Sequence, residues 1–179
     1  MDHDIVFKNP RIIDGTGSPW YRGSVGVADG TIKTVTRNEH LDLQGRETID
    51  CTGRVLSPGF IDTHSHSDLE VFVDSAIKPK LRQGITTEVL GQDGFSMAPM
   101  YRESGPNEWQ DHLAGLAGRP DIDWTWESTT EYFAAIEENG TAINLGMHVG
   151  HGTVRFNVMG MADRSPSAGE LAEMQEVIT

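Results

Sequence analysis

From residue 58 onward, short apolar runs alternate with helix-like segments, and this alternation restricts the possible folds more than any other feature of the sequence. The apolar runs are GFIDTHSH, ITTEVLGQD and TAINLGMHVGH, at residues 59–66, 85–93 and 141–151. The helix-like segments cover residues 74–84, 105–118, 127–140 and 165–179. Strands that alternate with helices form parallel β/α units, whose strands are usually buried on both faces. We therefore expect a parallel α/β fold built from three such units.

Three β/α units are too few to close a barrel, which requires eight parallel strands. In addition, no apolar run follows the last helix-like segment. We interpret residues 58–179 as the first three β/α units of a (β/α)8 barrel within a longer polypeptide. The alternative interpretation is a complete, small and open α/β domain.

Residues at the ends of the helix-like segments indicate where the helices begin and end. Ser128 or Thr129 is expected to cap the start of the segment at 127–140, and Gly140 is expected to end it. Pro79 is expected to interrupt the short helix near residue 80, because proline lacks a backbone N–H.

Before residue 58 the pattern is one of short strands and dense turns. The run DIVFKNPRIID is rich in β-branched residues, and GSVGVADGTIKTV contains Asp29-Gly30, which is typical of a two-residue hairpin turn. No segment in this part has helical periodicity. We expect residues 1–57 to form a small β-sandwich or sheet, as part of a composite domain to which a later part of the polypeptide also contributes.

The composition argues against several classes of partner. The 179 residues include 27 Asp and Glu but only 14 Lys and Arg, for a net charge of −13. An acidic surface repels phosphate backbones and anionic lipids, so we expect neither a nucleic-acid nor a membrane partner. No signal peptide and no apolar run of about 18 residues is evident. We expect a soluble, cytoplasmic protein, with its single cysteine, Cys51, as a small buried residue.

The ends of the first two predicted strands carry a candidate metal site. His64 and His66 are two residues apart, and side chains at that spacing point to the same side of a strand. Asp93 follows the second apolar run, and the carboxyl ends of barrel strands gather at one face. Imidazole and carboxylate groups bind divalent metals such as zinc. We therefore predict that His64, His66 and Asp93 bind a divalent metal ion.

Each candidate residue also has a simpler interpretation. The two histidines fit solvated or capping side chains, and Asp93-Gly94 is typical of a turn. His151 lies between two glycines and Arg155 could clamp a carboxylate, so both are candidate substrate-binding residues. An incidental loop histidine and a surface salt bridge are equally good interpretations of these two. Incidental or structural roles, including a place in the core for His148, are expected for the remaining histidines, which are His3, His40, His112 and His148.

Three segments resemble those of a known family. The run PGFIDTHSHSD, at residues 58–68, resembles the metal-binding signature of the amidohydrolase superfamily. GITTEVLGQDGFSMAP, at residues 84–99, and VGHGTVR, at residues 149–155, are similar to segments of the N-acyl-D-amino-acid deacylases, also called D-aminoacylases. The resemblance extends over nearly all of the chain, and the last two segments are the more specific to the deacylases.

The resemblance implies metal-dependent hydrolysis of the amide bond of N-acyl-D-amino acids, which are small-molecule substrates, with one or two zinc ions or another divalent metal. It implies that His64 and His66 are metal ligands. Asp93 stands where many members have a metal-binding cysteine, and a carboxylate is a harder ligand than a thiolate, so the identity of the metal stays open. The two later histidine ligands of the family and its general acid/base aspartate are expected beyond Thr179, so residues 1–179 alone are expected to be inactive.

Two alternatives remain beside this interpretation. A cyclic-amide hydrolase of the hydantoinase or dihydroorotase kind resembles this chain in the β domain and in His-x-His, but generally not in the two more specific segments. A non-catalytic interaction module with the same fold is the other alternative. Three barrel strands leave open sheet edges, so we expect residues 1–179 alone to be poorly stable or to form a homo-oligomer.

Overall fold

The computed structural model describes residues 3–38 and 41–178, and His40 lies outside the described residues. The chain divides into two compact units, Met1–Pro58 and Gly59–Thr179. Among the described residues, no helix combines the length and the apolar character needed to cross a membrane.

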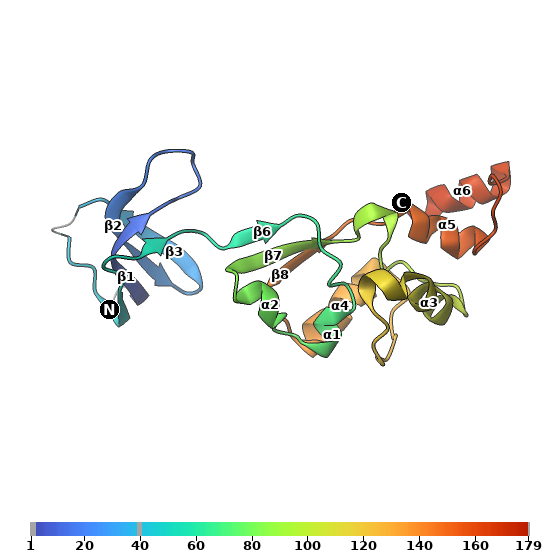
Figure 1. Ribbon diagram of the computed structural model, residues 1–179, viewed down its shortest axis with the longest axis horizontal. Helices are drawn as coiled ribbons and strands as arrows, with labels where there is room; N and C mark the ends of the chain where they lie inside the picture. Colours follow the sequence, from blue (N-terminus) through green and yellow to red (C-terminus); the bar gives the residue numbers. More distant parts are fainter. Residues whose placement is uncertain (1–2, 39–40, 179) are drawn as a thin grey trace. The chain divides into compact units, whose positions relative to one another are not determined.

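The first unit contains a mixed five-stranded sheet (Figure 1). Its strands are β1 (His3–Ile12), β2 (Tyr21–Ala28), β3 (Thr31–Thr36), β4 (Gly45–Asp50) and β5 (Val55–Leu56). The order is β3-β2-β1-β4, and β5 also pairs with β1. β1 is antiparallel to β2 but parallel to β4 and β5. The described residues of this unit therefore form the sheet that the sequence predicts, whereas the second layer of a sandwich stays a prediction.

The hairpin between β2 and β3 has the predicted turn. Asp29 and Gly30 have φ angles of 51° and 67°, and two successive positive φ angles are the signature of a type I′ turn. The sheet packs its apolar side chains into a small core that includes Val6, Val25 and Cys51. The prediction that Cys51 is a small buried residue is therefore confirmed.

The second unit has a three-stranded parallel sheet in the order β6-β7-β8. Its strands are β6 (Phe60–Asp62), β7 (Ile85–Leu90) and β8 (Asn144–Met147). Its helices are α1 (Glu70–Val73), α2 (Lys78–Leu81), the 3-10 turn η1 (Gln92–Gly94), α3 (Gly105–Ala117), α4 (Thr129–Asn139), α5 (His151–Met159) and α6 (Ala168–Val177). The structure therefore has the α/β character that the sequence predicts, while its place in a closed barrel stays a prediction.

Helices cover one side of this sheet. Figure 1 shows α1, α2 and α4 on the same side of β6, β7 and β8. Glu88 and Leu90 of β7 are fully buried, and Leu90 joins a core that includes Trp109, Trp126 and Tyr132. This core fills the space between the sheet and its helices.

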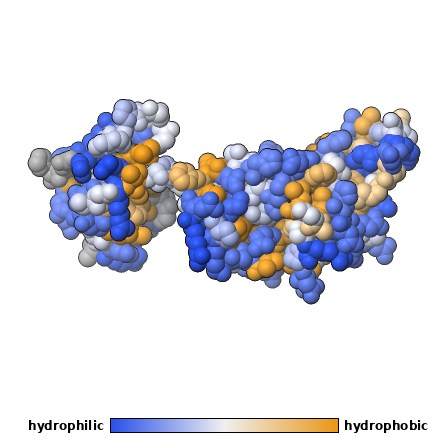
Figure 2. Space-filling view, in the orientation of Figure 1, coloured by the Kyte–Doolittle hydropathy of each residue, from blue (hydrophilic) through white to orange (hydrophobic). Residues whose placement is uncertain are grey.

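The expectation that every strand is buried on both faces is wrong for β6, and β8 has no fully buried residue either. The side chains of Phe60 and Ile61 are 60% and 63% exposed. β6 lies at the edge of the sheet, and helices cover one side only, so the described residues leave its apolar side chains in solvent. Figure 2 shows hydrophilic residues, in blue, over most of the visible face of this unit, with several hydrophobic patches, in orange, between them.

Helix α4 has the predicted residues at both its start and its end. The Ser128 hydroxyl accepts the N–H of Glu131, and the Glu131 carboxylate accepts the N–H of Ser128, which completes a capping box. Gly140 closes the helix with a φ of 81°. Pro79, in contrast, lies in the first turn of α2, where proline is tolerated because the first N–H groups of a helix have no partner within it. The expected interruption at Pro79 is therefore wrong.

Ser128→Ala is expected to lower the free energy of unfolding by about 1 kcal/mol, because the N–H of Glu131 loses its acceptor. Urea unfolding followed by circular dichroism measures this change. Thr130→Ala is the matched control, since Thr130 is exposed in the same helix turn and alanine favours helix formation. Equal loss of stability in both variants would contradict the capping role.

The start of α6 has a pH-dependent ion pair. The Arg164 guanidinium donates to the Glu170 carboxylate at 2.8 Å, and together with the N–H of Ser167 it lowers the pKa of Glu170 from 4.5 to about 2. Because the folded-state pKa is the lower one, ionised Glu170 stabilises the fold above about pH 4.5. This contribution is lost as the pH falls toward 2.

Glu170→Gln is therefore expected to reduce stability at pH 6, and the difference from the wild type should narrow as the pH falls to 3. Urea unfolding at several pH values measures the difference. Glu176→Gln is the control, because Glu176 lies near the negative end of the same helix, where ionised glutamate gains no stabilisation from the helix dipole. A Glu170→Gln deficit that does not change with pH would refute the role of the ion pair.

Candidate metal centre

The loops that follow β6 and β7 bring His64, His66 and Asp93 together. β6 ends at Asp62, so both histidines lie in the loop beyond the strand. The Nε2 atoms of His64 and His66 lie 3.2 Å and 3.1 Å from Oδ2 of Asp93. Each residue offers one donor atom, and the three donor atoms lie within 4.8 Å of one another. Within residues 3–38 and 41–178, this is the one such group of three or more residues.

The geometry and chemistry of these donors fit a divalent ion. Two ligands that are each about 2.0–2.1 Å from a tetrahedral zinc ion are about 3.3 Å apart. The two histidine-to-aspartate separations, 3.2 Å and 3.1 Å, are close to this value. The side chains of His64 and Asp93 are 59% and 51% exposed, whereas that of His66 is 20% exposed. The described residues therefore leave His64 and Asp93 open to solvent.

The loop that carries the histidines is fixed by the residues beneath it. Asp62 accepts the N–H of His64 at 3.2 Å. Ser65, between the two histidines, is buried and donates its hydroxyl to the Glu88 carboxylate at 3.0 Å. The N–H of His64 and the side chain of Ser65 are thus both tied to the strands below.

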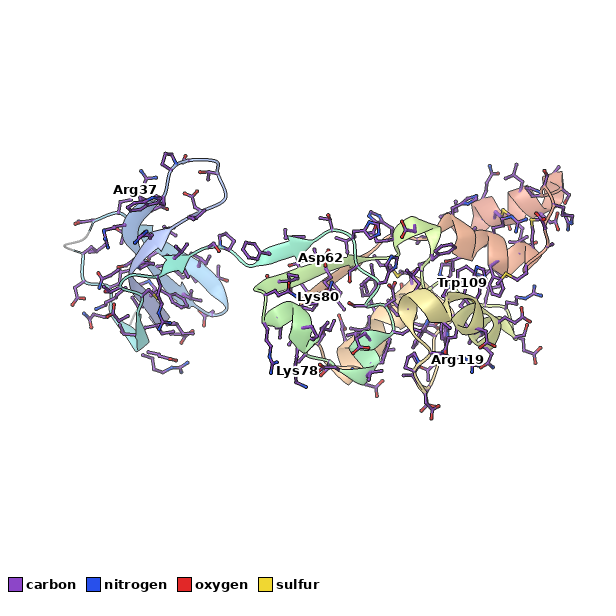
Figure 3. The ribbon with its side chains drawn as sticks, viewed as in Figure 1. Arg37, Asp62, Lys78, Lys80, Trp109 and Arg119 are labelled. Atoms are coloured by element: carbon purple, nitrogen blue, oxygen red, sulfur yellow. The ribbon has the colours of Figure 1, made fainter. Side chains whose placement is uncertain are left out.

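Lys80 connects the two carboxylates of this support. Its ammonium group lies 3.0 Å from Oε1 of the fully buried Glu88, and it also binds Asp62, toward which it points in Figure 3. The Lys80 hydrogen bond holds the pKa of Asp62 below its ordinary value. Sequence reasoning missed both Lys80 and Glu88. A glutamate inside an otherwise apolar β-branched run, ITTEVL, was the signal that could have found the second.

A buried aspartate also joins the two ligand loops. Asp68 is 1% exposed, and its carboxylate accepts the N–H of Gly91 at 3.1 Å. Burial raises the pKa of Asp68 to about 7. Its backbone carbonyl accepts the hydroxyl of the buried Tyr132 at 2.8 Å, which anchors the loop to α4.

Asp93 is both a turn residue and a member of the donor group. Its φ and ψ angles of 57° and 18° are left-handed, and it lies between Gly91 and Gly94, whose φ angles are 71° and 84°. Aspartate is one of the few non-glycine residues that adopt this conformation readily. The turn and the ligand interpretations are therefore compatible, because the turn aims the carboxylate at the two histidines.

The N-terminus of α5 packs against this turn through glycines. A Cβ on Gly150 would lie 2.4 Å from the carbonyl oxygen of Gly94, and a Cβ on Gly152 would lie 2.9 Å from the same atom. The buried pair Ser96 and Thr153 closes the contact, since the N–H of Ser96 donates to the Thr153 hydroxyl at 2.7 Å. The segment 149–155 therefore forms the entry to α5 and its first turn, next to the candidate metal centre.

His151 and Arg155 lie on this helix but outside the donor group. His151 is exposed at the first position of α5. Nη2 of Arg155 donates to the carbonyls of Ala162 and Arg164 at 2.6 Å and 2.8 Å, so it fastens the segment after α5. Arg155 also lines an open depression of about 430 Å³ with Phe95 and other residues. The substrate-binding role of His151 and Arg155 stays a prediction.

The other histidines take varied positions. His148 is exposed, so its expected place in the core is wrong; the strand β8 ends one residue before it. His3 is buried and bonds to the Thr34 hydroxyl at 3.0 Å. His112 stacks on Trp109 with ring centroids 5.6 Å apart. His3 and His112 therefore have structural contacts, as predicted.

The chain is similar to known proteins of one family. Residues 47–178 match the model of the amidohydrolase family. The chain is 33% identical to an N-acyl-D-aspartate deacylase of Alcaligenes xylosoxydans xylosoxydans over 175 residues, which are 98% of this chain and 34% of that protein. The chain thus spans about a third of the length of the curated relatives it matches.

Two solved structures share the fold of the chain. An N-acyl-D-glutamate deacylase of Bordetella bronchiseptica, complexed with zinc and a phosphonate inhibitor, matches with a TM-score of 0.82 and 30% identity, over 99% of this chain and 35% of that chain. A D-aminoacylase with a binuclear metal centre matches with a TM-score of 0.82 and 32% identity, over 98% of this chain and 35% of that chain.

Gly150→Ala is expected to lower the free energy of unfolding by about 1–3 kcal/mol, because the added Cβ overlaps the backbone of Gly94. The φ of Gly150 is −72°, which alanine adopts freely, so steric overlap is the sole cost. Gly146→Ala in β8 is the control, since a Cβ there meets nothing within 4 Å. Urea unfolding compares the two, and equal stability would show that the close approach is not needed.

Proposed function

Because the chain belongs to the amidohydrolase family, we propose that the protein containing it hydrolyses the amide bond of N-acyl-D-amino acids. The products are a carboxylate and a free D-amino acid. The observation that carries the proposal is the convergence of two imidazole nitrogens and one carboxylate oxygen at the ends of neighbouring parallel strands. Two of the relatives that match nearly the whole chain are deacylases of N-acyl-D-aspartate and N-acyl-D-glutamate, which supports a linear amide as the substrate.

His64, His66 and Asp93 are the residues that would hold the metal. A divalent ion bound there would supply Lewis acidity, which polarises a carbonyl oxygen and makes water easier to deprotonate. Asp93 brings a harder donor than a thiolate, so the proposal includes zinc and other divalent metals. Because the chain spans about a third of its relatives, the remaining ligands and the general acid/base aspartate are proposed to come from residues outside 1–179.

The residues of this chain have distinct tasks in the proposed reaction. Asp62 and Ser65 hold the backbone on either side of His64, and the left-handed turn holds the Asp93 carboxylate. Fixed ligands are needed because small displacements of the reacting groups strongly reduce the rate. The exposure of His64 and Asp93 leaves one side of the centre open to a small-molecule substrate.

The activity is tested with the full-length protein supplied with zinc and, separately, with cobalt. N-acyl-D-amino acids with acidic and apolar side chains are offered beside their L enantiomers and beside cyclic ureides. We expect hydrolysis of at least one N-acyl-D-amino acid, loss of activity with a chelator and its return with metal. Activity on the cyclic ureides alone would replace this proposal with the cyclic-amide hydrolase.

Asp93→Cys tests the ligand assignment without reference to turnover. If residue 93 binds the metal, cobalt added to the variant is expected to produce a sulfur-to-cobalt charge-transfer band, and the variant should favour soft metals more than the wild type does. The wild type serves as the control, because it differs from the variant only in lacking a cysteine at position 93, and Cys51 is buried in the first unit. A variant that binds cobalt without this band would exclude residue 93 as a ligand.

A further inference from the structure

Gln92 makes two hydrogen bonds that join the ligand loops. It precedes Asp93 in η1. Its side-chain Nε2 donates to the carbonyl of Thr63 at 2.9 Å and to the carbonyl of Val89 at 3.0 Å. Thr63 immediately precedes His64, and Val89 belongs to β7. One side chain therefore spans the gap between the two loops that carry the proposed ligands.

The contacts of Gln92 enclose the backbone of His64. On one side, the Thr63 carbonyl accepts from Gln92. On the other side, the N–H of Ser65 donates to the Val89 carbonyl at 3.3 Å, and that same carbonyl accepts the second bond from Gln92. Both peptide groups that flank His64 are therefore tied to the end of β7, one directly and the other through the Gln92 amide.

The base from which Gln92 reaches is itself fixed. The N–H of the preceding Gly91 donates to the buried Asp68 carboxylate at 3.1 Å. The carbonyl of Gln92 accepts the N–H of Phe95 at 2.8 Å, which closes the turn around Asp93. A side chain on an anchored backbone can set the position of a neighbouring loop, because its own movement is restricted.

We propose that Gln92 is a positioning residue for the metal centre, whose side-chain amide holds the His64 loop at the distance from Asp93 that metal binding requires. The inference rests on the proposed function. Glutamine suits this task because its amide has two N–H donors for the two carbonyls. Methionine has a similar length but no donor, and asparagine is one methylene shorter.

The effect is expected to fall on His64 more than on His66. His66 is two residues from the buried Asp68, whose carboxylate accepts the N–H of Gly91 without the Gln92 side chain. Loss of the Gln92 amide therefore frees the backbone on one side of the donor group while the other side stays fixed. Residues that orient metal ligands from outside the ligand set typically change metal affinity by about 10- to 100-fold when they are replaced.

Gln92→Met in the full-length protein tests the proposal with two measurements. Cobalt affinity is measured by competition with a chelator, and amide hydrogen exchange of Ser65 is measured in the metal-free protein. We expect cobalt affinity to fall by about 10-fold or more, and exchange at Ser65 to become severalfold faster, because its acceptor carbonyl is no longer held by Gln92.

Gln83→Met is the matched control. The Gln83 amide also donates to a backbone carbonyl, that of Pro79 at 2.9 Å, but this bond joins two residues of the α2 segment and neither of the loops that carry the proposed ligands. This variant is expected to keep wild-type cobalt affinity and wild-type exchange at Ser65.

The outcomes separate the inference from the proposed function. Wild-type cobalt affinity in Gln92→Met, or weaker affinity with unchanged exchange at Ser65, overturns the positioning role. A wild-type protein that binds no cobalt refutes the proposed metal centre itself. If the wild type binds no cobalt and amide exchange at Ser65 is unchanged in Gln92→Met, the data also refute the role of Gln92 in fixing the loop. If exchange at Ser65 is faster instead, Gln92 fixes the loop but not for metal binding, and the positioning role is overturned.

Discussion

The parallel pairing of β6 with β7 is the constraint on which the candidate metal centre depends. Ile61 pairs with Thr87 and Asp62 with Glu88, so both strands end at the same edge of the sheet. The chain leaves this edge twice, once toward the histidines and once toward Asp93. Asp93 is 29 residues from His64 and 27 residues from His66 in the sequence. A shift of one residue in this register would send the side chains of β6 to the opposite face.

The support beneath the ligand loops is polar rather than apolar. A buried ion pair contributes little to stability, because removing both charges from water costs about as much as their attraction returns. For Lys80, burial acts to lower the pKa, but the carboxylates of Asp62 and Glu88 outweigh it and raise the pKa. Lys80 therefore stays charged and holds both partners. Directional contacts of this kind fix the position of Ser65 and hence of its histidine neighbours, which apolar packing does less specifically.

Glycines allow close backbone contacts in the segments around the site. A Cβ on Gly91 would lie 2.0 Å from the carbonyl oxygen of His148, and one on Gly150 would overlap Gly94. The backbone of the turn around Asp93 and the backbone that leads into α5 therefore approach each other closely. A side chain larger than that of glycine at these positions would prevent this approach. The glycines of GQDGF and VGHG make this approach possible, while the chemistry belongs to their neighbours.

The sequence by itself determined the features that depend on nearby residues. These include the α/β alternation, the Asp29-Gly30 turn and the ends of α4. The meeting of His64, His66 and Asp93 was predicted from a rule of the fold, that parallel strands end at one edge of the sheet, and not from contacts between nearby residues. Only the tertiary structure decided the support by Lys80, Glu88 and Gln92, the exposure of β6 and of His148, and the binding of Arg155 to its own following segment. The physical reason is the range of the interactions: caps and turns act within about four residues, whereas Ser65 and Glu88 are 23 residues apart and meet only because two strands pair.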